Sequence, residues 1–522
     1  MRLYWLILVV VTVGIISAVL YLASPLIKEI YFRQVMTNPT ALLSAEDKEI
    51  IYQKLAADLP GIYEAVPDPN VGKLLQKNIS KTQRQASVVT NNVGLRDDRP
   101  YTQKASGTFR IVCLGDSFVE GTGGRVEDRF CNQLEDMINE YRLLGEGKTA
   151  QAYAVGVGSW SAVNEASYMI SHLSAYEPDL IIILLVSNDI ADGQGVSGIG
   201  TASNQFSPTN RAMGSGVFSD TIASNFSAPE TYLLYDLGPE SVSRWQKTFA
   251  LYKRLEDLQL ARGGAVIFSV LNSIEFFTQL AMNYHSQAGM TSPFLITDYF
   301  PDEQNALPHD PHPSRAGHRI LASHYLHAMA REGLIHAPDD ELVPLHPGLD
   351  LDTSIRVDAD YLAETREAIA EQYLPSHIEF NNLSNLEIQA FLGGIWPDLD
   401  SPMENRRQEF PYASIKAGFL LAREAKANHL AVELYLPPKP ELYPNTIRMF
   451  VNGKLADTLE IESVEQSGEW LLVAELDDPD DDGSIIEIML RSETHWSSLT
   501  DHTMRSFELR KAYQSAEPFP DN

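Results

Sequence analysis

The sequence predicts an α/β protein whose parallel sheet is covered by helices on both faces, with one membrane-spanning helix before it and a β-rich domain after it. Apolar runs typical of buried strands alternate with helical patterns through the middle of the chain. The N-terminus is a long uncharged stretch, and the last hundred residues alternate apolar and polar positions between turns. A chain of 522 residues is also too long for one ordinary core.

Composition excludes several kinds of function. The formal net charge of -30 argues against a surface that binds nucleic acid or anionic lipid. Two cysteines are too few for a disulfide scaffold or a thiolate zinc site. Cys113 lies inside an apolar run and is predicted to be a buried thiol, with a bridge to Cys131 as the less favoured alternative.

The first 27 residues are predicted to anchor the chain in a membrane. No charged residue occurs from Leu3 to Ile27, which is long enough to span a bilayer. A cleaved signal peptide is the alternative, but its apolar part would be shorter. The very short N-terminal tail favours export of the rest of the chain. Residues 28–105 are predicted to form a helical and extended lead-in, with a helix at 44–59.

The core elements follow in order. Strands are predicted at 109–115, 150–157, 179–186 and 265–271, and helices at 125–141, 161–173, 241–262 and 314–332. Such alternation gives a parallel sheet, whose ligands bind beyond the carboxyl ends of the strands. The segment 190–226, rich in Gly, Ser and Asn, is expected to border that site.

Polar segments follow the predicted strands and precede the last helix. They are Gly115-Asp116-Ser117, Gly156-Val157-Gly158-Ser159-Trp160, Val186-Ser187-Asn188-Asp189 and Asp310-Pro311-His312-Pro313. In order and placement they resemble the four sequence blocks of the SGNH (GDSL-like) hydrolases, over residues 88 to 333. The resemblance implies a flavodoxin-like three-layer α/β/α domain at 106–340 and a serine esterase that needs no metal and no cofactor.

The resemblance also implies roles for individual residues. Ser117 would be the nucleophile, His312 the general base and acid, and Asp310 the group that orients the imidazole. His309 and His318 are the competing histidines; His318 is expected to lie one turn into the last helix and to pack locally. Read without the resemblance, Gly115-Asp116-Ser117 is a turn that caps a helix.

The oxyanion hole would use the amide of Ser117, an amide of the second block and the side chain of Asn188. The second block departs from the family pattern, because Ser159 stands where the family has glycine and Gly158 comes one residue early. Both are therefore candidate donors. A helix cap is the plain alternative for Asn188. The stretch 88–96, with Asn91, Gly94 and Arg96 spaced as in many membrane-linked SGNH proteins, is interpreted as a hairpin over a sheet edge.

The remainder is predicted to be a linker and helix at 341–380, with the helix at 359–373, and a β-sandwich at 381–522 that is loosely similar to jelly-roll modules. Strands are expected at 430–436, 446–451, 454–461, 470–476, 484–491 and 506–510. Asn452-Gly453 is a hairpin turn signal. The acidic turn 477–483 is interpreted as solvated in preference to calcium-binding.

Together these features predict a membrane-anchored serine esterase outside the cytoplasm that hydrolyses or transfers an acyl group, in the first instance acetyl, on a carbohydrate. Its partners would be the acylated small-molecule or polysaccharide substrate and the membrane, with no nucleic acid; the sequence leaves protein partners open. A lipase or thioesterase of the same fold is the alternative within the enzymes. A non-catalytic cell-envelope binding or assembly protein is the alternative outside them.

Overall fold

A computed structural model describes most of the chain beyond residue 60. The described residues are 61–66, 71–83, 86–158, 160–191, 239–271, 275–302, 304–307, 310–338, 343–346, 356–381, 391–396, 412–424, 426–476, 485–497 and 504–519. The predicted membrane helix, the helix at 44–59, nearly all of 190–226 and the acidic turn lie outside these ranges. In the part that is described, no helix has both the length and the apolar character needed to cross a membrane.

A five-stranded parallel sheet forms the centre of the first body, as the sequence predicts. Its strands are β5 (Thr108–Gly115), β6 (Thr149–Gly156), β7 (Leu180–Leu185), β8 (Ala265–Leu271) and β9 (Phe294–Thr297). They are arranged in the order β6-β5-β7-β8-β9, and every neighbouring pair is parallel. Numbered along the chain this is 2-1-3-4-5, the flavodoxin-like order, whose switch point lies between β5 and β7.

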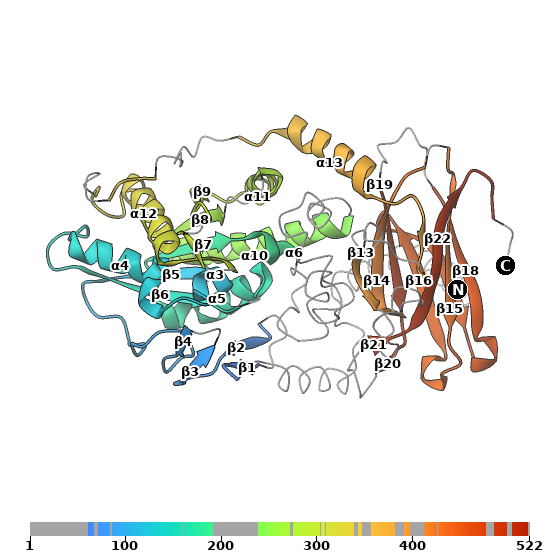
Figure 1. The fold of residues 1–522 in the computed structure, drawn as a ribbon, viewed down its shortest axis with the longest axis horizontal. Coiled ribbons are helices and arrows are strands. Elements are labelled where there is room, and N and C mark those ends of the chain that lie inside the picture. Colours follow the sequence, from blue (N-terminus) through green and yellow to red (C-terminus); the bar gives the residue numbers. More distant parts are fainter. Residues whose placement is uncertain are drawn as a thin grey trace, which may run out of the picture.

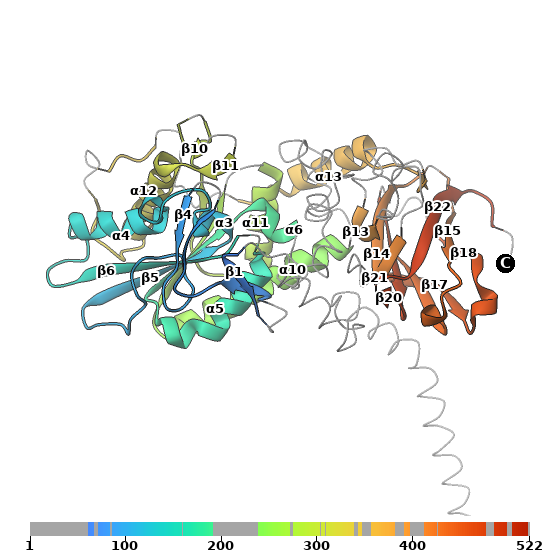
Figure 2. The same cartoon turned by 60° about the horizontal axis from the view of Figure 1, so that its bottom comes forward.

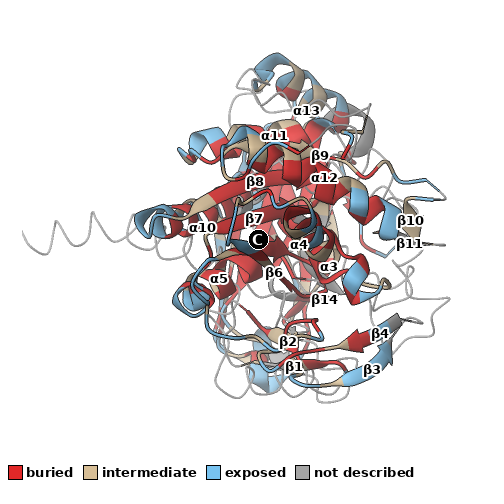
Figure 3. Cartoon of the chain, turned by 90° about the vertical axis from the view of Figure 1, so that its left-hand side faces the viewer, coloured by how far each residue is buried: buried red, intermediate tan, exposed pale blue. Residues whose placement is uncertain are grey.

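Helices cover both faces of this sheet. They are α4 (Phe130–Glu140), α5 (Ala162–Tyr176), α10 (Pro239–Ala261), α11 (Glu275–Gln287) and α12 (Arg315–Arg331). Leu180, Ile182 and Leu184 of β7 join the core beneath α4 and α12, whereas the alternate residues of β7 join the core beneath α5, α10 and α11. Because side chains alternate between faces and both faces are covered, the strand is an uninterrupted apolar run. Figure 3 shows the buried strands between these two helix layers.

Two details differ from the prediction for this body. Helix α4 begins at Phe130 and not near Arg125, because a 3₁₀ turn at Val126–Asp128 and an extended Arg129 precede it. Helix α11 and strand β9 were not predicted from the sequence. Neither has a long run of apolar residues or a strong capping signal, so their formation depends on packing against the neighbouring strands of the sheet.

The lead-in segment belongs to the same body. Its described residues form four short strands: β1 (Tyr63–Ala65), β2 (Lys73–Leu75), β3 (Ser80–Gln83) and β4 (Ala86–Val89), paired as β1-β2 and β3-β4. Its Ile62, Leu75, Val88 and Leu95 are buried in the core that lies beneath α5 and α10. In Figure 1 these strands (blue) lie along the lower side of the α/β body.

The second body is a nine-stranded antiparallel sheet. Its strands are β12 (Ile378–Glu379), β13 (Phe391–Trp396), β14 (Tyr412–Ala422), β15 (His429–Leu436), β16 (Asn445–Val451), β17 (Lys454–Ile461), β18 (Gly468–Glu475), β19 (Ile485–Ser492) and β22 (Phe507–Ser515). Hydrogen bonds join them in one sheet, with the main order β17-β16-β19-β14-β22-β15-β18. The predicted sandwich is therefore a single sheet that folds over into two layers around one core (Figure 1).

The six strands predicted here are confirmed, and β12, β13 and β14 were missed. Asn452 and Gly453 have φ values of 48° and 73° and join β16 to β17, which confirms the hairpin turn.

Helix α13 (Ala359–Tyr373) connects the two bodies and has the predicted bounds. Its Leu362 and Ile369 share one hydrophobic cluster with Phe277 of α11 and with Leu420 and Phe450 of the antiparallel sheet. Figures 1 and 2 show α13 between the α/β body and the orange strands.

Candidate active site

Ser117 lies where the first core strand ends. β5 stops at Gly115, and the one-turn helix α3 (Ser117–Glu120) follows. Asp116 caps this turn: its Oδ1 accepts the N–H of Phe118 at 2.9 Å. The half-buried Ser117 thus stands at the carboxyl edge of the sheet, beside the switch point where ligands of such sheets bind.

His312 lies next to Ser117 although 195 residues separate them in the sequence. The imidazole Nε2 is 2.8 Å from the Ser117 hydroxyl oxygen. His312 belongs to β11 (Asp310–Pro313), which pairs with β10 (Ala306–Leu307) just before α12. Its ring packs against Phe118, with the ring centres 4.8 Å apart. This arrangement is suited to moving a proton between a serine hydroxyl and an imidazole.

The Ser117 hydroxyl has a second partner, because Oδ2 of Asp116 lies 3.1 Å away and can accept its proton. A hydroxyl carries one proton, so it donates either to Asp116 or to His312. With Nε2 unprotonated, donation to His312 is the arrangement that activates the serine.

Asp310 lies two residues before His312 on β11, and its side chain is outside the described part of the chain. Its role in orienting the imidazole stays a prediction. His318 lies in α12, as the sequence predicts, buried and stacked on Phe130 with ring centres 6.2 Å apart.

The candidate oxyanion donors lie at the ends of β6 and β7. The N–H of Gly158 donates to the Glu120 carboxylate, so in this structure it is already engaged. Ser159 is outside the described residues, which leaves its amide as the second-block donor to be tested. Asn188 lies in α6 (Ser187–Ala191), directly after β7; only its backbone is described.

A buried arginine from the lead-in segment supports the turn that follows Ser117. Arg96 is 1% exposed. Its guanidinium donates to the backbone oxygens of Glu120 (3.1 Å) and Ser87 (3.0 Å), and also to those of Gly121 and Gly124. Sequence reasoning missed this role, although the spacing of the motif contained the signal.

The hairpin interpretation of residues 88–96 is corrected by the same geometry. β4 does belong to a hairpin, but residues 91–96 form a turn in which Asn91 Oδ1 accepts the N–H groups of Val93 and Leu95, each at 3.1 Å. Gly94 has a φ of 82°, which favours glycine. The turn directs Arg96 beneath the nucleophile loop.

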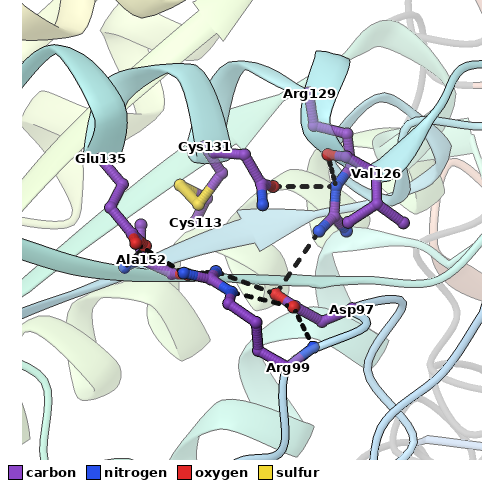
Figure 4. The surroundings of a disulfide bond; sticks show 9 residues. Asp97, Arg99, Cys113, Val126, Arg129, Cys131, Glu135 and Ala152 are labelled. Atoms are coloured by element: carbon purple, nitrogen blue, oxygen red, sulfur yellow. Dashed lines mark hydrogen bonds and ion pairs between the residues drawn. A yellow bond between two sulfur atoms is a disulfide. The ribbon is translucent and has the colours of Figure 1, made fainter.

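The predicted Cys113 thiol is wrong, because Cys113 of β5 forms a disulfide with Cys131 of α4. Their Cα atoms are 6.2 Å apart, within the usual range for a bridge. Only the packing of α4 on the sheet brings them together, which the sequence does not show. Figure 4 shows the bridge beside the ion pairs of Arg99 with Asp97 (3.1 Å) and Glu135 (2.5 Å).

Beneath the site lies a group of buried carboxyls. Glu165 of α5 and Asp189 of α6 are fully buried. Burial, followed by the charge of Asp116, raises the pKa of Glu165 to about 8. Burial and the Glu165 charge raise the pKa of Asp189 well above its usual range. The carboxyls of Glu165 and Asp189 therefore favour the protonated, uncharged form.

Comparison with known proteins gives little beyond this geometry. No protein-family model and no curated protein matches the chain. Among solved structures, a two-domain esterase active on acetylated mannans, crystallised with mannopentaose, is similar at 14% identity and a TM-score of 0.29, over 79% of this chain and 92% of its own. A GDSL-like lipase from Bacteroides thetaiotaomicron is 14% identical with a TM-score of 0.27, over 44% and 93% of the two chains. Similarity at this level assigns no function to the chain.

Proposed function

We propose that this protein is a serine esterase or acyltransferase of the SGNH type. The observation that carries the proposal is the 2.8 Å contact between Ser117 Oγ and His312 Nε2 at the carboxyl edge of a parallel sheet. A serine hydroxyl is a weak nucleophile until a neighbouring base takes its proton. Few structural roles require a serine and a histidine from opposite ends of a domain to meet at a sheet edge.

In the proposed mechanism Ser117 attacks the carbonyl carbon of the ester as its proton passes to His312. The oxyanion is stabilised by the amides of Ser117 and Ser159 and by the Asn188 side chain. His312 then protonates the leaving alcohol, which leaves an acyl group on Ser117. A water or a sugar hydroxyl releases that group in the second half, with His312 again as base. Asp310 holds the imidazole in the required tautomer.

The proposed substrate is an acylated, first of all acetylated, carbohydrate outside the cytoplasm. The predicted N-terminal anchor and the second, antiparallel body support this choice. The Cys113–Cys131 disulfide supports the compartment, because such bonds persist in oxidising surroundings.

The mechanism is tested with the full chain in detergent, a fluorophosphonate probe and p-nitrophenyl acetate. Labelling and turnover should be lost in Ser117→Ala and fall by about a thousandfold in His312→Ala. The matched control is His336→Ala, since His336 is exposed in the segment that follows α12. Turnover retained in Ser117→Ala would refute the mechanism. A folded wild type that neither reacts with the probe nor hydrolyses esters would favour the binding-protein alternative.

Location is tested separately, by adding protease to intact cells. An exported chain should lose everything after the anchor, whereas a chain protected until lysis would contradict export. Panels of acetylated saccharides and of long-chain esters then separate a carbohydrate esterase from a lipase or thioesterase.

A further inference from the structure

Glu165 and Asp189 form a pair that the proposed mechanism does not use. Oε2 of Glu165 accepts the hydroxyl proton of Tyr252 from α10 at 2.8 Å. Oδ2 of Asp189 accepts the N–H of Val186 at 2.7 Å. In each carboxyl, one oxygen thus accepts a hydrogen bond from a neighbouring donor.

The other two oxygens face no donor. Glu165 Oε1 and Asp189 Oδ1 are both buried and receive no N–H or O–H from the described residues, and the two carboxyl groups act on each other at hydrogen-bonding range. Ionised carboxylates only accept hydrogen bonds. A hydrogen bond between two carboxyl groups therefore requires a proton on one of them.

The surroundings also disfavour two negative charges. Both side chains are fully buried, and two adjacent buried carboxylates cannot both ionise without a large cost. The titratable groups that act on the pair are Asp116, from the N-cap of α3, and Tyr252, from α10; no Lys, Arg or His of the described chain acts on either carboxyl. Asp116 adds negative charge, so nothing there compensates a second ionisation.

The pair also holds the segment that follows β7. The N–H of Asp189 donates to Val186 O at 3.1 Å while its side chain accepts the N–H of Val186, which closes a tight turn. Asn188 lies within that turn. Through Glu165, the turn is tied to α5 and α10.

We propose that Glu165 and Asp189 share a single proton, and that the protonated pair positions the turn carrying Asn188 at the carboxyl edge of the sheet. The second part rests on the proposed function, in which the Asn188 side chain contributes an oxyanion donor. Loss of the proton would place two carboxylates against each other and beside Asp116, and the turn would open. Glu165 and Asp189 are positioning residues and do not touch the substrate.

The shared proton is tested through folding, without any substrate. A group whose pKa is raised from 4.5 to about 8 on folding makes the native state bind one more proton than the unfolded state between those pH values. Its stabilising effect is complete below about pH 4.5, is lost as the pH rises to about 8, and changes no further above that.

The variant Glu165→Gln keeps an N–H donor toward Asp189 without a proton that titrates. The folding equilibrium constant of the wild-type chain, relative to Glu165→Gln, should therefore fall about tenfold per pH unit through that window. Glu256→Gln is the matched control, since Glu256 is a fully buried carboxyl on α10 that lies 3.3 Å from Lys253. The folding equilibrium constant of Glu256→Gln should fall with pH through the same window as that of the wild-type chain. An unchanged decline in Glu165→Gln would overturn the proposal.

Two further measurements keep the test decisive. If Glu165→Gln does not fold, Asp189→Asn removes the same proton and should give the same loss of pH dependence. In the wild-type chain, infrared spectra should show a protonated carboxyl at pH 7 that disappears near pH 9, and the absence of that band would also overturn the proposal.

The positioning role is read from the pH dependence of fluorophosphonate labelling. The rate at which the probe labels Ser117 in the wild-type chain should fall about tenfold per pH unit above pH 8, and in Glu165→Gln it should not fall in that range. A labelling rate that still falls above pH 8 in Glu165→Gln would refute the positioning role. If Ser117 is not labelled at any pH, the proposed function fails, while the folding and infrared measurements still decide whether the proton is shared.

Discussion

At the scale of single residues, the nucleophile loop depends on side chains that come from outside it. Arg96 donates to three backbone oxygens of the turn that follows Ser117, those of Glu120, Gly121 and Gly124, and to Ser87 O of β4; its bonds to Glu120 and Gly121 are buried. The planar guanidinium can serve several acceptors at once, whereas a lysine ammonium is a point charge on a flexible stem.

Arg96→Lys should therefore destabilise the chain by about 2–4 kcal/mol and slow labelling of Ser117, because buried carbonyls lose their donors. Urea unfolding and probe-labelling rates measure the two effects. Arg319→Lys, an exposed arginine on α12, is the control and should behave as wild type. Equal behaviour of the two lysine variants would show that Arg96 has no special role.

His318 sets a second expectation at this scale, with the opposite pH dependence to Glu165. Burial, with Arg129 next, lowers the pKa of His318 to about 3, so the native state excludes a proton that the unfolded state binds. The free energy of unfolding is therefore not reduced by His318 above about pH 6.5, where the imidazole is neutral in both states. As the pH falls toward 3 it decreases by about 1.4 kcal/mol per pH unit. His318→Leu should unfold at a lower pH than wild type in a melting series, and an unshifted acid midpoint would contradict this.

At the scale of elements, a covalent bond joins the strand that ends before the nucleophile to the helix that follows it. The disulfide between β5 and α4 closes a loop with a sequence separation of 18. In the loop-entropy view, a bridge of this span stabilises the fold by about 3 kcal/mol.

Reduction should lower the urea midpoint of the wild-type chain by a corresponding amount. The double variant Cys113→Ala/Cys131→Ala should start from a lower midpoint and show no response to the reductant. A wild-type midpoint that reductant leaves unchanged, with the thiols shown to be free, would contradict a stabilising bridge.

At the scale of the whole molecule, α13 makes the two bodies share one apolar cluster. Leu420, Phe450 and Met489 lie on the face of the antiparallel sheet that meets this cluster, and their neighbours along each strand face the inner core. These strands are therefore buried on both faces, which explains their continuous apolar runs.

Ile369→Asp should uncouple the bodies, because it places a charge in that cluster. Calorimetry should show two separated unfolding transitions in the variant where wild type has one. Ala368→Asp adds the same charge at an exposed neighbouring position and should keep the wild-type profile. One transition in both variants would mean that α13 does not couple the bodies.

The sequence by itself determined four strands of the parallel sheet, the helix that follows His312, α13 and the Asn452-Gly453 hairpin. Each has a strong local pattern: buried runs such as 180–185, a Ser314 cap, helical periodicity, and a turn that needs positive φ. The candidate pair of Ser117 and His312 was also predicted, although from the order of motifs and not from any local pattern.

Only the tertiary structure decided the remaining features, because they depend on which elements pack together. The disulfide needs α4 to lie on β5, and Arg96 acts on carbonyls that lie far from it along the chain. The Glu165–Asp189 pair joins two helices, in neither of which a buried acid has a sequence signal. Local patterns record what each residue needs from its neighbours in the chain, whereas contacts between distant segments arise only when the chain has folded.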